Sequence, residues 1–333
     1  MKRIPISVLE LAVVSEGGNA ATAIAGTVKV AQQAENLGYK RIWLAEHHNT
    51  GNIASSATSV LIGHVAGQTN GKIRVGSGGI MLPNHSTLAI AEQFGTLASI
   101  YPDNIDLGLG RAPGTDPLTA LALRRNSSFS HYDFEAEILQ LQAYFSTENR
   151  HAKVRAFPGE GVQVPLWVLG SSTDSAHLAS KLGLPYVFAA HFAPQQLMAA
   201  IDIYRRNFQP SGHLKKPYVM ACVNVMAADT NEEAELLSTS LYRMFWGLLT
   251  NMRIPLPPPA PLPDFFQNPE VQQALHRMTA NTFTGDKQTL REKLSDFVYT
   301  TGIDELMITS HIFDLDAKLK SFTIVKEAME ETV

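Results

Sequence analysis

The sequence predicts a single (β/α)8 barrel over residues 1–333, and three observations support this fold. Short apolar runs typical of buried strands alternate with longer stretches of helical periodicity. Eight such β-then-α units fill 333 residues, a length that barrels of this kind commonly occupy as one domain. Polar residues follow the ends of several apolar runs, where such barrels place their functional groups. A doubly wound open sheet has the same alternation, but no clean Gly-x-Gly-x-x-Gly follows the first run.

The strands and helices are predicted from periodicity and from residues that end helices. The first helix places Ala23, Val30, Ala34 and Leu37 on one face and ends at Gly38. The predicted strands cover residues 4–9, 41–48, 73–82, 105–109, 165–170, 186–190, 218–226 and 305–309. The predicted helices cover residues 22–37, 55–68, 86–100, 133–145, 194–208, 230–248, 286–300 and 317–330, with one more that begins after Ser172.

Two segments fit neither pattern and are predicted as insertions. Residues 115–132 lack clear periodicity. Residues 251–264 carry six prolines, so they can form neither a helix nor a central strand, and the insertion extends to about residue 268. The chain that follows is too short to build a core of its own. We therefore expect this proline-rich segment to lie beside a cavity rather than to link two domains.

Composition narrows the function classes. The net charge is -4 and charged residues make up 17% of the chain, so no basic field is available for nucleic acid or anionic lipid. No apolar run approaches the roughly 18 residues that span a bilayer. The first apolar run reaches only Glu10, which is too short for the h-region of a signal peptide, so we expect none. The single cysteine, Cys222, excludes an internal disulfide. We expect a cytoplasmic protein that binds neither nucleic acid nor membrane.

The tripeptide Glu46-His47-His48 ends the second predicted strand. Because neighbouring side chains of a strand point to opposite faces, two adjacent histidines do not readily chelate one ion, and no metal is predicted. The two imidazoles would then have different roles, one toward the barrel axis and one toward the helices or a partner chain. The alternative is that both are hydrogen-bonded structural histidines. Glu46, if buried, requires a partner that the sequence does not name.

Ser77, Gly78 and Gly79 lie inside an otherwise apolar strand. Two adjacent glycines there lose more backbone entropy on folding than other residues would. This loss is explained if a flat ligand must approach the main chain. A planar cofactor meets that requirement. A β-bulge or a tight contact between the strand and the surrounding helices explains the glycines equally simply.

A phosphate site is predicted from two further strand ends. Arg111 follows the fourth strand, and guanidinium groups match phosphate oxygens in a bidentate manner. Gly170, Ser171 and Ser172 precede a helix, whose first N–H groups and dipole favour an anion. A plain N-cap is the alternative for this loop. His191, Asp229 and His311 follow later strands and could line the same mouth.

These residues occur within longer motifs whose order and spacing resemble the bacterial luciferase-like family of flavin-dependent monooxygenases. The resemblance covers nearly the whole chain. The motifs that carry it are Trp43-Leu44-Ala45-Glu46-His47-His48, Val75 to Pro83, Ala91-Glu92-Gln93-Phe94, Asp106 to Arg111, Thr284-Gly285-Asp286 and Gly302 to Glu305.

The resemblance implies a (β/α)8 barrel that holds reduced FMN, with His47 as the catalytic base. It places Ser77, Gly78 and Gly79 in a stretch with a non-proline cis peptide under the flavin ring. Luciferase itself has alanines at the glycine pair. Arg111 and the loop Gly170-Ser171-Ser172 match the flavin phosphate site.

Two further positions carry implications from the same family. Luciferase has a cysteine where this chain has Gly110, which makes light emission a poor expectation. His48 and Glu92 match residues that meet across a subunit interface, which implies a homodimer.

The implied activity is that of a two-component monooxygenase. A separate flavin reductase supplies FMNH2, which reacts with O2 through a C4a-peroxyflavin to oxygenate a small organic substrate, and His47 moves protons. Alternatives are an F420-dependent oxidoreductase that transfers hydride, a flavin-binding protein without catalysis, and a metal-dependent barrel hydrolase. The sequence does not identify the substrate, since specificity would depend on the two insertions.

Overall fold

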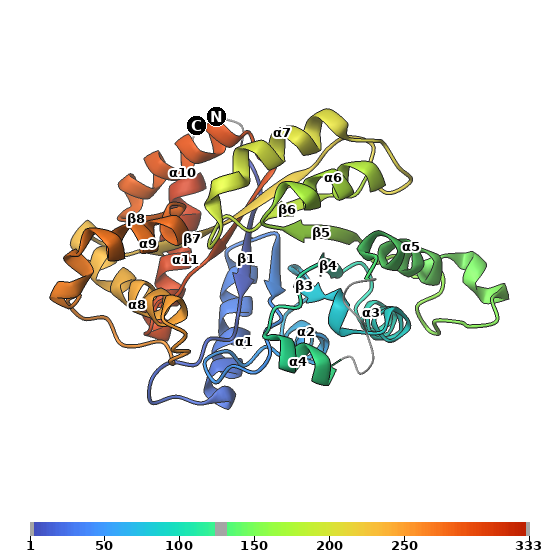
Figure 1. Ribbon diagram of the computed structural model, residues 1–333, viewed down its shortest axis with the longest axis horizontal. Helices are drawn as coiled ribbons and strands as arrows, with labels where there is room; N and C mark the ends of the chain where they lie inside the picture. The colour runs from blue at the N-terminus through green and yellow to red at the C-terminus, as the bar shows by residue number, and fades with distance from the viewer. Residues whose placement is uncertain (1–2, 124–131, 331–333) are drawn as a thin grey trace.

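Eight parallel strands form the central barrel in a computed structural model that describes residues 3–123 and 132–330 (Figure 1). The strands are β1 (Ile6–Glu10), β2 (Arg41–Leu44), β3 (Arg74–Met81), β4 (Ile105–Gly110), β5 (Leu166–Gly170), β6 (Tyr186–Phe188), β7 (Val219–Ala227) and β9 (Glu305–Thr309). The sheet closes because β1 pairs with both β2 and β9, and β7 pairs with both β6 and β9. The predicted (β/α)8 fold is therefore confirmed.

The second strand is shorter than predicted. It ends at Leu44, so Glu46, His47 and His48 lie in the loop that follows and not on the strand. The neighbouring strand β3 shifts register against β4 between Ser77 and Ile80, so β2 loses a straight partner beyond Leu44. The two histidines therefore do not lie on a strand, and the prediction that the alternation of side chains along a strand separates them was wrong.

A ninth strand, β8 (Thr282–Gly285), was not predicted. It is parallel to the last part of β7, where Asn224 lies opposite Thr282, whereas the first part of β7 pairs with β6, with Val219 opposite Tyr186. The nine-residue β7 therefore extends beyond the barrel and carries β8 beside its end.

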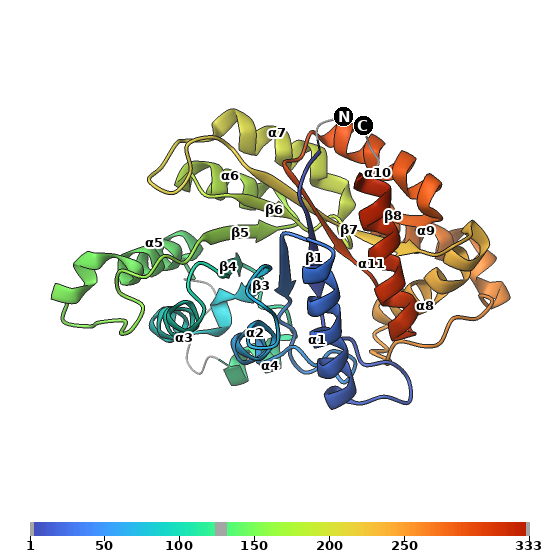
Figure 2. The same cartoon turned by 180° about the vertical axis from the view of Figure 1, so that it is seen from behind.

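Helices cover the outside of the barrel close to where the periodicity places them. They are α1 (Ala20–Asn36), α2 (Thr58–Ala66), α3 (Thr87–Ile100), α5 (Phe134–Phe145), α6 (Thr173–Leu182), α7 (Leu197–Asn207), α8 (Asn231–Leu249), α10 (Lys287–Thr301) and α11 (Leu315–Glu330). Asn19 caps α1 in a reciprocal capping box with Thr22, and Gly38 follows that helix at φ +71°. Figure 2 shows α1 and α11 packed side by side against the barrel.

The two predicted insertions have some regular structure. A short helix, α4 (Pro117–Leu123), begins the first insertion, and residues 124–131 lie outside the described part of the chain. The proline-rich segment forms neither helix nor strand over residues 251–263 apart from a bridge between Ser15 and Leu256. It leads into a helix that periodicity missed, α9 (Pro269–Thr279).

Apolar side chains fill the barrel and the layer between strands and helices. The interior contains Leu9, Trp43, Trp167, Met220 and Met307, all nearly inaccessible to solvent. At the N-terminal ends of the strands, the Arg41 guanidinium binds Glu305 at 2.7 Å and Asp106 at 2.6 Å. These buried ion pairs join β2, β4 and β9 and close one end of the barrel with charge, so the functional residues of the opposite end stand on a rigid base.

Candidate functional site

The residues singled out by the sequence gather at one end of the barrel. Parallel strands end on the same side, so the loops after β2, β4, β5, β6 and β9 bring together His47, Arg111, Ser172, His191 and His311. Elements far apart in the sequence therefore build one mouth, as in other barrels.

Glu46 is the structural centre of this mouth. Its carboxylate is 1% exposed and accepts hydrogen bonds from His48 Nε2 at 2.8 Å, His85 Nε2 at 2.9 Å and the Met81 backbone N–H at 3.0 Å. Asn84 Nδ2 donates to the same carboxylate at 3.2 Å. Burial by itself raises the pKa of Glu46, but the bonds from His48 and His85 outweigh it and lower the pKa to about 2. Glu46 thus ties the loop after β2 to the loop after β3.

The hydrogen bonds of Glu46 define the state of its two imidazole partners. Because an ionised carboxylate only accepts hydrogen bonds, His48 and His85 both carry a proton on Nε2. A carboxylate oxygen of Glu46 and one ring nitrogen each of His48 and His85 lie within 4.8 Å of one another, which is also close enough for the three atoms to hold one cation. Mutual hydrogen bonding satisfies all three side chains, and we interpret the group as a hydrogen-bonded cluster.

His47 has a different hydrogen-bond partner from that cluster. Its imidazole hydrogen-bonds the backbone of Gly114, which follows β4 at φ +63°. Burial lowers the pKa of His47 below its ordinary value, the Gly114 bond partly opposes this shift, and the charge of Arg253 adds to it. His47 is therefore neutral near pH 7 and can accept a proton.

The predicted interface pair consists of His48 and Glu92. The His48 ring is 11% exposed and bonded to Glu46 of its own chain. Glu92 is exposed on α3. Within one chain, therefore, the Nε2 of His48 is already used, and a partner chain would find Glu92 accessible but His48 largely covered.

The Ser77-Gly78-Gly79 stretch contains the β-bulge that the sequence offered as one explanation of its glycines. Ser77 is fully buried, and its hydroxyl donates to the Gly108 carbonyl at 2.9 Å and accepts from the Gly108 N–H at 3.0 Å. These two hydrogen bonds hold β3 to β4 at the point where the register of the two strands shifts, so a β-bulge is present. The peptide bond between Gly78 and Gly79 is cis.

Close packing also explains the first of these glycines. A Cβ on Gly78 would lie 2.6 Å from Leu9 Cδ1 and 3.0 Å from Trp43 Cβ, inside the barrel. No side chain larger than hydrogen fits there without movement. Close packing against Leu9 and Trp43 is therefore sufficient to explain the glycine at position 78.

Arg111 and the loop before α6 are neighbours in space, as the phosphate prediction requires. Arg111 Nη2 lies 3.1 Å from Asp174 Oδ2 in the first turn of α6, and both side chains are more than half exposed. The N-cap residue Ser172 makes no side-chain cap hydrogen bond, so the plain N-cap explanation has no bond to support it. A Cβ on Gly170 would lie 2.1 Å from Ser175 Oγ, so glycine is required at that position for the loop to close on α6.

Buried polar atoms without partners line the far side of the mouth. Within the described residues, His191 Nδ1, Asn224 Oδ1, Ser310 Oγ and His311 Nδ1 are buried and accept or donate no hydrogen bond. Burial lowers the pKa of His191 and of His311 to about 3, so both rings are neutral at pH 7. Such atoms usually face a ligand or water.

Sequence reasoning missed two residues of this mouth and left a third open. Asn224 stands in the middle of the apolar strand β7, a pattern that marks a buried polar group. Arg253 of the proline-rich segment donates to the Asn49 carbonyl at 3.3 Å and affects His47 by its charge. Asp229 instead forms an exposed ion pair with Lys320.

A cavity of about 230 Å³ adjoins His311. Ser310, Leu256 of the proline-rich segment, and the buried ion pair of Glu10 with Lys318 also line it. The expectation that the proline-rich segment lies beside a cavity thus agrees with the position of Leu256. Among the described helices, none combines the length and apolar character needed to cross a lipid bilayer.

A family model described as luciferase-like monooxygenase matches residues 4–305. An uncharacterised protein of Bacillus subtilis, YvbT, is 50% identical over 97% of this chain and 96% of its own length. A protein of Escherichia coli K12 named luciferase-like monooxygenase is 46% identical over 99% of this chain and 98% of its own. The crystal structure of apo-MsnO8 superposes with a TM-score of 0.89 at 34% identity, covering 99% of both chains.

More distant proteins differ in what their names say they bind. N-acetyl-S-alkylcysteine monooxygenase of Bacillus subtilis is 31% identical over 98% of both chains. Two solved structures share only the fold at 17% and 16% identity: a Pseudomonas putida 3,6-diketocamphane monooxygenase constituent with FMN (TM-score 0.74), and an F420-dependent secondary alcohol dehydrogenase with an F420-acetone adduct (TM-score 0.66). They cover 100% and 98% of this chain, and 99% of each of their own. From the family model and the close relatives, the chain belongs to the luciferase-like monooxygenase family.

Proposed function

We propose that this protein is a two-component monooxygenase that takes reduced FMN from a separate flavin reductase and uses O2 to oxygenate a small organic substrate. When bound, FMNH2 would supply the two electrons needed for one oxygen atom to go to the substrate and the other to leave as water. The observation that supports the proposal is that one barrel mouth brings together a guanidinium, Arg111 beside the α6 N-terminus, and a buried imidazole with a lowered pKa, His47.

The phosphate of FMN is assigned to Arg111 and the loop Gly170-Ser171-Ser172. The guanidinium provides paired donors, and the loop provides hydroxyls and the positive end of α6. In the structure, the Arg111 guanidinium is already paired with the Asp174 carboxylate. Phosphate binding requires this exposed pair to open, which costs little because solvent already screens it.

The flavin ring is assigned to the backbone of Ser77, Gly78 and Gly79. Ser77 contributes only its position, because its hydroxyl is already hydrogen-bonded to the Gly108 backbone. The unpartnered atoms of His191, Asn224 and His311 line the other strands of the mouth and offer hydrogen bonds to a ligand. When bound, reduced FMN would activate O2, and the protein would orient it and exclude water.

His47 is assigned the proton transfer. A neutral imidazole with a lowered pKa accepts a proton near pH 7, and the Gly114 backbone holds its orientation. Glu46 does not contact the reacting centre in this proposal. It positions His47 by fixing the loop on either side of it through His48 and Met81.

We also propose a cytoplasmic homodimer in which residues 1–333 form one domain, with residues 115–132 and 251–268 shaping substrate specificity. Glu92 is exposed on α3 and available to a partner chain. Val60 on α2 and Ile100 on α3 are 69% and 60% exposed, and two apolar side chains on adjacent helices suit a helix-mediated interface. Analytical ultracentrifugation of the wild type and of Glu92→Lys tests the assembly.

The test of the activity compares two reduced cofactors. Purified protein is titrated anaerobically with FMNH2 and with reduced F420, and each complex is then mixed with O2 in a stopped-flow spectrometer. We expect tighter binding of FMNH2 and oxygen consumption coupled to an oxygenated product when an N-acetyl-S-alkylcysteine is supplied, the substrate class named for the relative at 31% identity.

Other outcomes favour the alternatives. Exclusive binding of reduced F420 without oxygen consumption would identify a hydride-transferring oxidoreductase. If the protein binds FMNH2 but the bound flavin is reoxidised by O2 at the same rate as free flavin, the protein would be a flavin-binding protein without catalysis.

A further inference from the structure

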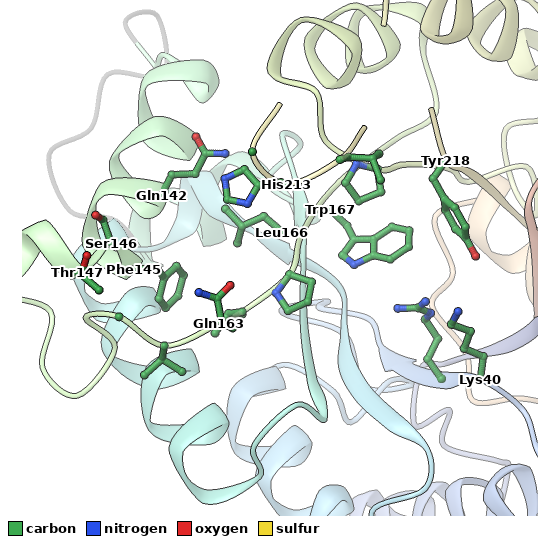
Figure 3. A pocket seen from close by; sticks show the side chains of 18 residues that line it. Lys40, Gln142, Phe145, Ser146, Thr147, Gln163, Leu166, Trp167, His213 and Tyr218 are labelled. Atoms are coloured by element: carbon green, nitrogen blue, oxygen red, sulfur yellow. The ribbon is translucent and has the colours of Figure 1, made fainter. Parts of the chain in front are cut away.

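A second cavity of about 760 Å³ opens at the opposite end of the barrel (Figure 3). The start of β2 contributes Lys40 and Arg41, the start of β5 contributes Trp167, and Tyr218 precedes β7. Phe145 at the end of α5 forms part of the outer wall. The volume falls within the range of roughly 300–1,000 Å³ that small-molecule sites occupy. No proposed step of the oxygenation uses this cavity.

Trp167 lines this cavity and carries an unsatisfied hydrogen-bond donor. Its side chain is only 6% exposed, and its Nε1 is buried without a hydrogen-bond partner among the described residues. The ring cannot easily turn away, because the Arg41 guanidinium lies 4.5 Å from its centroid and Trp43 and Tyr218 pack edge-on at 5.2 and 5.7 Å. A fixed, buried N–H in a cavity wall calls for an acceptor from a ligand or a water molecule.

The charges around the cavity favour an anion. Among the described residues that line it, none is aspartate or glutamate. Glu305 and Asp106 neutralise Arg41 from behind, whereas Lys40 is exposed, and in Figure 3 its ammonium end points toward Trp167 and Tyr218. A ligand that accepts from the indole N–H can therefore also pair with a cation.

The remaining wall is apolar. Phe145 and Leu166 are buried and face the cavity in Figure 3, and Pro185 also lines it. Their surface suits the body of a ligand rather than its charged end, because burying apolar area there stabilises binding without any further polar contact. A bare inorganic anion would leave this wall without a partner.

We propose that this cavity binds an organic anion with an aromatic or aliphatic body, such as an aryl carboxylate or sulfonate. An anionic oxygen accepts from Trp167 Nε1–H and pairs with Lys40, and the body packs against Phe145 and Leu166. The site is distinct from the proposed flavin mouth and does not depend on the proposed function. Because Arg41 begins the strand that leads to His47, the bound anion touches an element shared by both sites.

The probe is 8-anilinonaphthalene-1-sulfonate, an aromatic anion that fluoresces when shielded from water. We expect saturable binding of one equivalent to the full chain that excess FMN does not displace. Naphthalene-1-sulfonate should compete at least about tenfold better than the uncharged naphthalene-1-sulfonamide, because a charge-assisted hydrogen bond is lost with the charge.

Three variants locate the bound probe. Lys40→Gln should weaken binding about fivefold, with Lys216→Gln, an exposed lysine outside the lining, as the matched control. Trp167→Phe keeps an aromatic ring and should weaken binding about tenfold. Gly212→Trp fills the cavity mouth and should abolish binding, whereas Gly212→Ala should not, because a Cβ at Gly212 meets nothing within 4 Å.

The proposal is overturned by any of three results. These are no saturable binding up to about 1 mM probe, stoichiometric displacement by FMN, or unchanged affinity in both Lys40→Gln and Gly212→Trp. The last two variants change exposed positions, so they report on the site even if Trp167→Phe does not fold.

Discussion

Glu46 Oε1 and His48 Nε2 lie 2.8 Å apart, although His47 separates them along the chain and forms its own hydrogen bond with Gly114. The loop after β2 therefore presents alternate side chains in different directions even though it has left the sheet. Glu46 and His48 belong to the framework of the mouth, and His47 is available for chemistry. The predictions below separate these two roles.

Replacing Glu46 by Gln should destabilise the fold. An amide places an NH2 group against donors on His48, His85 and Met81, so at least one buried hydrogen bond is lost. We expect a loss of about 1–3 kcal/mol in the free energy of unfolding, measured by urea denaturation. Glu16→Gln, at an exposed position, is the control and should change stability little.

The same Glu46 variant tests whether its cluster is a hydrogen-bonded unit or a metal site. Elemental analysis of wild-type protein should find less than about 0.1 equivalent of any transition metal. One equivalent of zinc or iron that is lost in Glu46→Gln would contradict our interpretation of Glu46, His48 and His85.

Arg111→Ala should weaken FMN binding about 10- to 100-fold, because a charge-assisted, paired contact with phosphate is lost. Riboflavin, which lacks the phosphate, should bind the variant and the wild type equally. Fluorescence titration measures both affinities. If Arg111→Ala binds FMN as the wild type does, the phosphate site is elsewhere.

Asp174→Asn should have the opposite effect to Arg111→Ala. The carboxylate competes with phosphate for the Arg111 guanidinium across 3.1 Å, so its removal should tighten FMN binding by about two- to fivefold. The effect should shrink as ionic strength rises, since both side chains are exposed. Weaker FMN binding in this variant would mean that Asp174 positions the arginine instead of competing for it.

His47→Ala should still bind FMN but should lose about 10²–10⁴-fold in the rate of substrate oxygenation. His64→Ala, an exposed histidine on α2, serves as the control. Because burial lowers the pKa of His47 from 6.5, the base form persists below that pH and the acid limb of the wild-type rate profile should lie under pH 6.5. A wild-type rate in His47→Ala would remove its assignment as the base.

Stability should fall as pH decreases below 6.5 because of His191 and His311. Burial lowers the pKa of each to about 3, so the unfolded state takes up protons that the folded state refuses. Each group costs about 1.4 kcal/mol per pH unit between these two pKa values. Urea unfolding at pH 7, 6 and 5 measures the slope, and His311→Phe should reduce it. An unchanged slope would show that His311 is protonated in the folded protein.

The order and approximate bounds of the elements follow from the sequence, because periodicity is local information. The pattern of apolar residues in 22–37 and the glycine after it suffice to place α1, and periodicity also places α10 and α11 close to their observed bounds. The short strand β8 and the helix α9 escaped prediction, since the first has four residues and depends on the far end of β7 for pairing.

The sequence by itself determined that His47, Arg111, Ser172, His191 and His311 meet at one mouth, since in a parallel barrel every strand ends on the same side. Only the tertiary structure decided what each one does. Glu46 gained its partner His85 from 39 positions away, and Arg111 found Asp174 across 63. Whether a side chain is free or bonded depends on groups that the chain brings together only by folding. For that reason the sequence named His47 and Arg111, while the role of Glu46 awaited the fold.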